Sequence, residues 1–271
     1  MAAETHLLSD PPGRADRIGA HLRWWRGLRR LSQLELAGRA DVSTRHLSFV
    51  ETGRSHPSRE MVLHLAEQLE VPFRRRNELL LAAGYAPGFQ ESEAPTGNVR
   101  EVLDQLLAAH MPAPAIVVDR HWNIVTMNEA ASLFAELVDP DLLTEPLNAL
   151  RLTLHPDGLL GRVAQPGPLA AHLFHRVRRQ AEIAADPALS ALVDELEVNI
   201  GDLLTRTPIP LHPNTPVLQV ELDIGGERRS FITTMTTFGT PLDVGTSELA
   251  LETFHPADEA TRTFLEDRAR L

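Results

Sequence analysis

Hydrophobic residues in the first ninety positions recur every three or four residues, which is the spacing of amphipathic helices. The first such segment places Leu22, Trp25 and Leu28 on one face and leaves most of its arginines outside. Gly53 and Gly84 stand where a helix would end. The spacing predicts five short helices, over residues 18–30, 32–40, 43–52, 59–69 and 74–83.

The second and third of these helices are separated by only a tight turn. Ser32 is a good N-cap, and Glu35 three residues later completes a capping box. Asp41 stands where the turn needs a residue that tolerates the left-handed region. Ser43 precedes the next helix, and the pattern as a whole indicates a helix-turn-helix. An ordinary helical hairpin in a core is the alternative.

After residue 112 the pattern changes to short apolar or alternating runs, which favour strands. Residues 217–224 alternate strictly, and Gly225-Gly226 forms a two-residue hairpin turn before the next run. The predicted strands cover residues 115–119, 123–128, 217–224, 229–238 and 247–254. The predicted helices cover residues 129–137, 146–154, 169–185 and 187–206, with a short charged helix after 256. This order predicts an α+β domain with an antiparallel sheet.

Composition shifts divide the chain further. Residues 1–16 are polar, contain Pro11-Pro12-Gly13, and are expected to be a flexible arm. Residues 88–97 are rich in Pro, Gly, Ser and Glu, as in a linker. The predicted domains are therefore 17–87 and 98–271. The second begins with an amphipathic helix, 99–110, that either connects the domains or pairs with a partner copy.

The length of 271 residues suits two domains, and an apolar fraction of 43% suits folded cores. The chain has no cysteine, which excludes disulfides and thiolate metal sites. It shows no secretory signal and no apolar run approaching 18 residues. We therefore expect a soluble cytoplasmic protein without membrane association.

Charge is distributed unevenly along the chain. Residues 1–90 contain 13 arginines and 10 acidic residues, a net charge of +3, whereas the remainder has a net charge of −14. Between Arg17 and Arg59 there are nine arginines and three acidic residues. A basic island in a protein of net charge −11 indicates nucleic-acid binding by one domain only.

The residues from Ile18 to Pro87 resemble the XRE family of helix-turn-helix repressors. The resemblance rests on Gln33, Ala37, Val42-Ser43, Leu47-Ser48 and Glu51-Thr52-Gly53-Arg54 with Pro57-Ser58. Asp41 departs from the family's usual glycine. The resemblance implies five short helices around one small core, and a recognition helix at 43–52 that enters the major groove of DNA.

Arg45 is the best candidate for a bidentate contact with guanine, although a solvated surface arginine is the alternative. Thr44 and Ser48 are secondary candidates for reading bases. Three further residues are expected to hold phosphates and set the register: Gln33, Ser43 and Arg54. We expect Glu51 to bond within the domain rather than touch DNA.

The second domain resembles the MmyB-like ligand-binding domain, a PAS-like module that follows XRE-type domains. The resemblance spans Asn98 to Phe254. It rests on Pro112-Ala113-Pro114-Ala115, Trp122 to Asn128, Asn148 and Arg151 with His155-Pro156, and the closing strands. It implies that the domain binds a ligand.

A sheet with helices across one face can enclose an apolar pocket. Candidate lining residues are Trp122, Phe134, Leu150, Phe231 and Met235, with plain core packing as the alternative for each. Asn148 and Arg151 lie three residues apart and could hold a carboxylate, or else form an internal ion pair.

These features together predict a transcription regulator that binds an inverted-repeat operator as a homodimer, controlled by a small apolar or acyl-like ligand. The alternative is a regulator whose second domain only dimerises or binds a protein. No catalytic constellation and no third metal ligand beside His172 and His175 occurs in the sequence. We therefore expect no enzyme activity, no cofactor and no bound metal.

Overall fold

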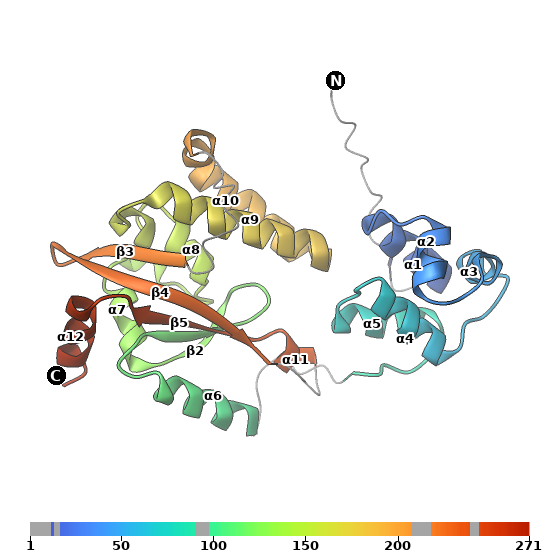
Figure 1. Cartoon of the computed structure of the whole chain (residues 1–271), viewed down its shortest axis with the longest axis horizontal. Coiled ribbons are helices and arrows are strands. Elements are labelled where there is room, and N and C mark those ends of the chain that lie inside the picture. Colours follow the sequence, from blue (N-terminus) through green and yellow to red (C-terminus); the bar gives the residue numbers. More distant parts are fainter. Residues whose placement is uncertain (1–11, 14–16, 90–97, 208–217, 239–243, 271) are drawn as a thin grey trace. The chain divides into compact units, whose positions relative to one another are not determined.

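The computed structural model describes residues 12–13, 17–89, 98–207, 218–238 and 244–270 (Figure 1). These residues form two compact units, which we call the helical unit (17–89) and the sheet unit (98–207, 218–238 and 245–270). The predicted flexible arm at 1–16 and the predicted linker at 88–97 fall almost entirely outside the described residues, so both remain predictions.

The helical unit contains five helices where the apolar spacing predicts five. They are α1 (Ile18–Leu28), α2 (Gln33–Arg39), α3 (Thr44–Glu51), α4 (Arg59–Gln68) and α5 (Phe73–Ala82). The capping box of α2 is present, since the Ser32 hydroxyl accepts from the Glu35 N–H and the Glu35 carboxylate accepts from the Ser32 N–H. This confirms the predicted all-α helix-turn-helix arrangement.

Each helix of this unit is followed by a residue in the left-handed conformation. Each helix therefore ends one or two residues before the end that the apolar pattern predicts. Arg30, Asp41 and Glu70 take φ values of 53°, 51° and 50°, and glycines 53 and 84 take 75° and 78°. In every case the following N–H reaches back to a carbonyl five residues earlier, for example Val42 to Ala37 at 3.0 Å. This closure satisfies carbonyls at the helix end and accounts for the shorter helices.

The close crossing of α1 and α3 depends on Gly19. A Cβ atom on this residue would lie 2.2 Å from the Glu51 carbonyl oxygen and 2.8 Å from the Val50 carbonyl oxygen. The two helices therefore pack backbone against backbone at this point. Leu22, Trp25, Leu47 and Val50 are buried beside the crossing.

The sheet unit is built on a five-stranded antiparallel sheet in the order β2-β1-β5-β4-β3. The strands are β1 (Ala115–Val118), β2 (Ile124–Met127), β3 (Leu218–Ile224), β4 (Glu227–Thr237) and β5 (Ala250–Pro256). As predicted, Gly225-Gly226 turns the chain between β3 and β4, with positive φ at both residues. The predicted α+β fold class with an antiparallel sheet is confirmed.

Helices cover both faces of this sheet (Figure 1). One face packs against α8 (Ala149–Leu154), α9 (Pro166–Ala184) and α10 (Pro187–Arg206), which form the main core with Ile116, Val118 and Phe231. The opposite face of β1 and β5 packs against α6 (Asn98–Ala109), where Leu103 and Leu107 contact a smaller cluster. A final helix, α12 (Glu259–Arg268), follows β5.

Two predicted helices are shorter in the structure, and two turns were not predicted. Residues 129–137 form a 3₁₀ turn, η1 (Glu129–Ala131), and a short α7 (Ser132–Ala135), because the buried Asn128 side chain caps the turn. Residues 140–142 and 159–162 are further 3₁₀ turns, η2 (Pro140–Leu142) and η3 (Leu159–Arg162). The helix predicted at 146–154 begins only at residue 149, because the Asn148 side-chain oxygen caps it by accepting the N–H groups of Leu150 and Arg151.

The strand predicted at 247–254 is wrong at its start. Residues Val244–Ser247 form a helical turn, α11, and β5 runs from Ala250 to Pro256. The pairing of β5 with β4 ends at Thr237 opposite Ala250, and its pairing with β1 ends at Val118 opposite the same residue. Residues before Ala250 have no neighbouring strand with which to form backbone hydrogen bonds, so they form a turn instead of a strand.

Two glycine substitutions should have opposite effects on stability. Gly19→Ala places its methyl group against backbone carbonyls and should destabilise the helical unit by about 3 kcal/mol. Gly38→Ala on α2 meets no atom within 4 Å and should stabilise it by about 0.5–1 kcal/mol through helix propensity. Urea denaturation of both variants checks the prediction, and equal effects would contradict the close crossing.

Candidate nucleic-acid interface and ligand cavity

The recognition helix α3 presents a buried face and an open face. Its N-terminus is capped by Ser43, whose hydroxyl accepts the His46 N–H at 3.1 Å. Leu47, Val50 and Glu51 are buried against the rest of the unit. Arg45 is exposed, and Thr44 and Ser48 are partly exposed. The three residues predicted to read bases are therefore accessible from outside the unit.

Two arginines of this region share one aromatic ring. The guanidinium of Arg45 lies 5.3 Å from the ring centre of Phe49, and that of Arg54 lies 6.0 Å from it. Attraction between a cation and an aromatic face limits the rotamers of both arginines. Phe49 thereby gathers the predicted base-contacting and phosphate-contacting groups at the end of α3.

The buried carboxylate of Glu51 bonds within the unit, as predicted, and it connects three helices. It accepts from the Arg26 Nε at 2.8 Å, the Arg26 Nη2 at 3.0 Å and the Gln33 Nε2 at 2.7 Å. Gln33, predicted to hold a phosphate, is thus oriented from inside the unit. An amide nitrogen carries two hydrogens, so one remains for a phosphate oxygen.

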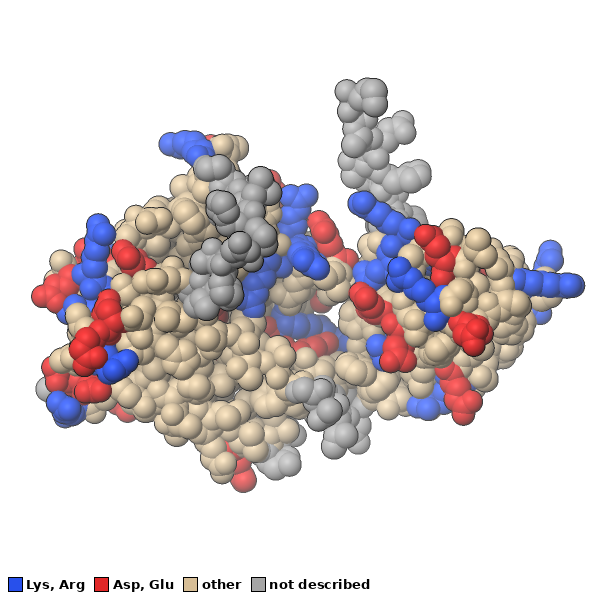
Figure 2. All heavy atoms as spheres, in the orientation of Figure 1, with Lys and Arg blue, Asp and Glu red and all other residues tan. Residues whose placement is uncertain are grey.

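The visible surface of the helical unit carries several basic side chains. Figure 2 shows them with acidic side chains interspersed, and one basic group projects at the right-hand edge beside the place of α3. Exposed arginines of this kind attract phosphates without reading sequence.

A cavity of about 100 Å³ lies in the sheet unit, between the sheet and the helices on its main face. Its walls come from all five strands, from α7, α8 and α9, and from the turns η1 and η3, and most of its lining is apolar. Four of the predicted lining residues do border it, and all lie in or against the main core: Trp122, Phe134, Leu150 and Phe231.

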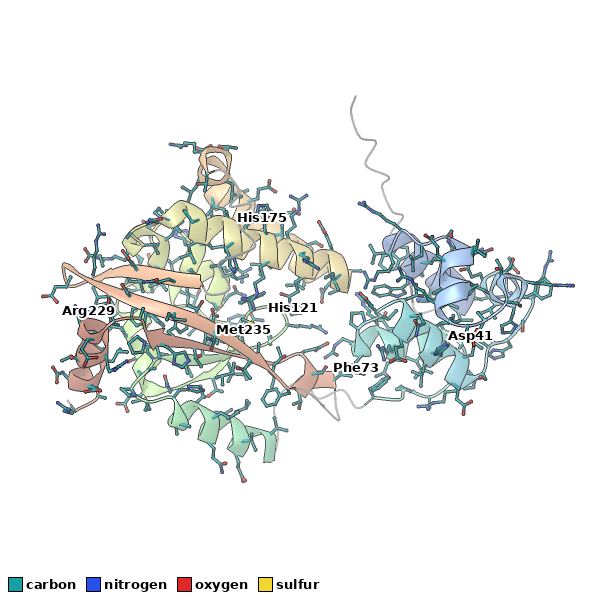
Figure 3. All side chains as sticks on the ribbon, viewed as in Figure 1. Asp41, Phe73, His121, His175, Arg229 and Met235 are labelled. Atoms are coloured by element: carbon teal, nitrogen blue, oxygen red, sulfur yellow. The ribbon has the colours of Figure 1, made fainter. Side chains whose placement is uncertain are left out.

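Three other predicted ligand residues do not line the cavity. Arg151 forms an exposed ion pair with Glu195, at 2.7 Å from both nitrogens, so the alternative of an ion pair holds. Asn148 is occupied in capping α8 and in donating to the His121 carbonyl at 2.8 Å. Met235, labelled on β4 in Figure 3, receives a hydrogen bond from Arg176 at its sulfur.

Trp122 is held in the cavity wall by a chain of polar contacts. Its backbone takes a φ of 67°, and its indole N–H donates to the Gln180 side-chain oxygen at 2.9 Å. The Gln180 amide in turn donates to the Arg120 carbonyl at 2.9 Å. The guanidinium of Arg176 lies 4.9 Å from the centre of the indole ring. Gln180 and Arg176 therefore fix the position of the Trp122 ring.

The Asp186 carboxylate secures the start of α10 near this wall. It accepts from the His121 ring at 3.0 Å and caps the helix through the Ala188 N–H at 2.9 Å. The hydrogen bond from His121 holds the pKa of Asp186 well below its usual range, together with the Ala188 N–H and Arg120. The hydrogen bond between His121 and Asp186 thus links the loop after β1 to the corner between α9 and α10.

Glu252 lines the cavity and was missed by the sequence analysis. It lies on β5 directly opposite Met235 of β4 and Ile116 of β1, and it is partly buried. Burial raises the pKa of its carboxyl to about 7, and Arg176 opposes this rise. The alternation of β5 could have revealed it, since Ala250 and Phe254 pack on the main core and residue 252 shares their face.

No group of three or more His, Asp or Glu side chains in the described ranges could hold a metal ion. No helix in the same ranges is long and apolar enough to cross a membrane.

Comparisons with known proteins agree with the division of the chain into a helical unit and a sheet unit. A family profile described as "MmyB-like transcription regulator ligand binding domain" matches residues 99–267, and a "Helix-turn-helix" profile matches residues 22–75. No curated protein matches the chain. The PAS domain of Bordetella pertussis BvgS is 17% identical over 63% of this chain and 99% of its own, with a TM-score of 0.27.

Neutralising the buried carboxylate should weaken the helical unit. Glu51→Gln leaves the Arg26 guanidinium without an anion in a partly buried position, which should cost about 3 kcal/mol. Glu60→Gln, at an exposed glutamate of α4, is the matched control and should change stability by less than about 0.5 kcal/mol. Urea denaturation measures both, and equal values would exclude a structural role for Glu51.

Glu252 should make stability depend on pH. Its carboxyl binds a proton more tightly in the folded than in the unfolded state, so its contribution is fully present below about pH 4.5 and declines up to about pH 7. Between pH 4.5 and pH 8, wild type should therefore lose up to about 3 kcal/mol relative to Glu252→Gln. Denaturation across this range tests the prediction, with exposed Glu197→Gln as the control.

Proposed function

The chain belongs to the family of MmyB-like transcription regulators and carries an XRE-type helix-turn-helix, and from this premise we propose that a small apolar ligand controls its binding to DNA. The observation that carries the proposal is the apolar cavity in the sheet unit, bordered by Trp122, Phe134 and Phe231. A preformed cavity of this kind is the usual form of a small-molecule site.

DNA binding is assigned to α3 and the N-terminus of α2. Support comes from the accessible Arg45, Thr44 and Ser48, and from the Phe49 ring that gathers Arg45 and Arg54. One recognition helix reads few base pairs, so we propose a homodimer on an inverted-repeat operator. Ligand binding would shift the population between two dimer geometries, and so change operator affinity.

The alternative function is a regulator whose sheet unit only dimerises or binds a protein. A fully packed core would favour that alternative, and the cavity of about 100 Å³ instead favours a ligand. We further propose that the protein acts in the cytoplasm, where its DNA target is accessible, and that it performs no catalysis.

Native mass spectrometry of the purified full-length chain tests the ligand proposal. We expect a dimer that carries a small molecule, released on denaturation and identified from its mass. A protein that remains empty after exposure to a cell extract, and whose operator binding is unaffected by that extract, would contradict ligand control and favour the interaction module.

Arg45→Ala and Arg54→Ala should affect DNA binding differently. Loss of Arg45 should cost about 1–3 kcal/mol on a duplex selected from a random pool and relax the preference at one base pair. Loss of Arg54 should weaken binding to selected and scrambled duplexes equally. It should also reduce the salt dependence of the binding constant by the amount expected for about one phosphate contact. Gel-shift titrations at several salt concentrations measure both effects.

The exposed Arg39 of α2, replaced by alanine, serves as the control for general loss of positive charge. If Arg45→Ala behaves as this control does on both duplexes, the assignment of base reading to Arg45 is wrong.

A further inference from the structure

The cavity of the sheet unit contains one acidic side chain. Glu252 lies on the central strand β5, among lining residues that are otherwise apolar apart from Thr153 and Thr233. Throughout the described ranges, no hydrogen bond or ion pair engages its carboxyl group. An acid placed in an apolar cavity without a partner is costly unless a bound group satisfies it.

Arg176 is the cation that acts on Glu252, but it is occupied elsewhere. Its guanidinium lies over the Trp122 ring and donates to the Met235 sulfur, and it does not border the cavity. No ion pair joins Arg176 and Glu252 in the part of the chain that the structure describes. Arg176 therefore attracts the charge of Glu252 without lining the cavity. The Glu252 carboxyl, which does line the cavity, can still accept a hydrogen bond from a bound molecule.

We propose that Glu252 anchors the polar end of the ligand, and that this ligand is a neutral molecule with an apolar body and one hydroxyl donor. The proposal rests on the proposed function and specifies the ligand class for the same cavity. The hydroxyl donates its hydrogen to the Glu252 carboxylate, and the apolar body contacts Trp122 and the phenylalanines of the lining.

The charge balance of the site selects a neutral ligand. Glu252 and Arg176 together carry no net charge when both are ionised. An ammonium or carboxylate group would add an uncompensated charge to a largely apolar cavity, which is unfavourable. A hydroxyl leaves the balance unchanged and supplies the donor that the ionised carboxyl lacks.

The volume of the cavity sets the size of suitable probes. An engineered apolar cavity of ~150 Å³ binds benzene, which has six carbon atoms, so a cavity of about 100 Å³ suits molecules of roughly four or five non-hydrogen atoms. 1-Butanol and 1-methoxypropane are isomers of this size, and only the first carries a hydroxyl hydrogen. Butylamine and propanoate provide the charged counterparts.

Ligand-observed NMR titrations of the full-length protein with these four probes test the proposal. 1-Butanol should bind wild type about tenfold more tightly than 1-methoxypropane and more tightly than either charged probe. Glu252→Leu should abolish the preference between the isomers, while Glu252→Gln, which retains an acceptor oxygen, should keep part of it. Glu197→Gln, at an exposed glutamate outside the cavity, should leave the preference unchanged.

Thermal denaturation confirms that each variant is folded before titration. Equal binding of the two isomers to wild type, or a preference that survives Glu252→Leu, would overturn the role of Glu252 and leave ligand binding itself intact. Tighter binding of butylamine or propanoate would overturn the neutral class in favour of a charged ligand. If no probe binds wild type, the cavity is not a ligand site, and the proposed function fails together with this inference.

Discussion

The DNA-binding half of this protein depends on one buried carboxylate. Glu51 closes α3, yet its side chain points into the helical unit, where it binds Arg26 of α1 and Gln33 of α2. A charge in that position is tolerated only because every contact is short and charge-assisted. Since the same helix presents Arg45 outward, the internal bonds of Glu51 fix the direction in which the outer side chains face.

The sheet unit contains the opposite case. Glu252 also lies inside a folded unit, but no described side chain bonds to it, and its pKa is raised to about 7 by burial. The two glutamates obey the same physical rule, that an acid wholly or partly withdrawn from water needs a partner. In the helical unit the chain provides the partner, whereas in the sheet unit we infer that a ligand does.

Local sequence signals predicted most of the architecture. The capping box of Ser32 and Glu35, the left-handed Asp41 and the Gly225-Gly226 turn all act through hydrogen bonds within a few residues, and each is present in the structure. Element ends were less predictable, because they depend on where a left-handed closure or a strand partner stops. The early start predicted for β5 failed for this reason, since neither neighbouring strand extends past Ala250.

By itself the sequence determined the two-part organisation, the family resemblance and the apolar faces, because periodicity and caps are properties of short segments. It also placed four aromatic and aliphatic residues in the cavity wall. Only the tertiary structure separated Met235, Asn148 and Arg151 from that cavity and brought Glu252 into it. Which side chains meet across a sheet and three helices is decided by packing between distant segments, and no local pattern contains that information.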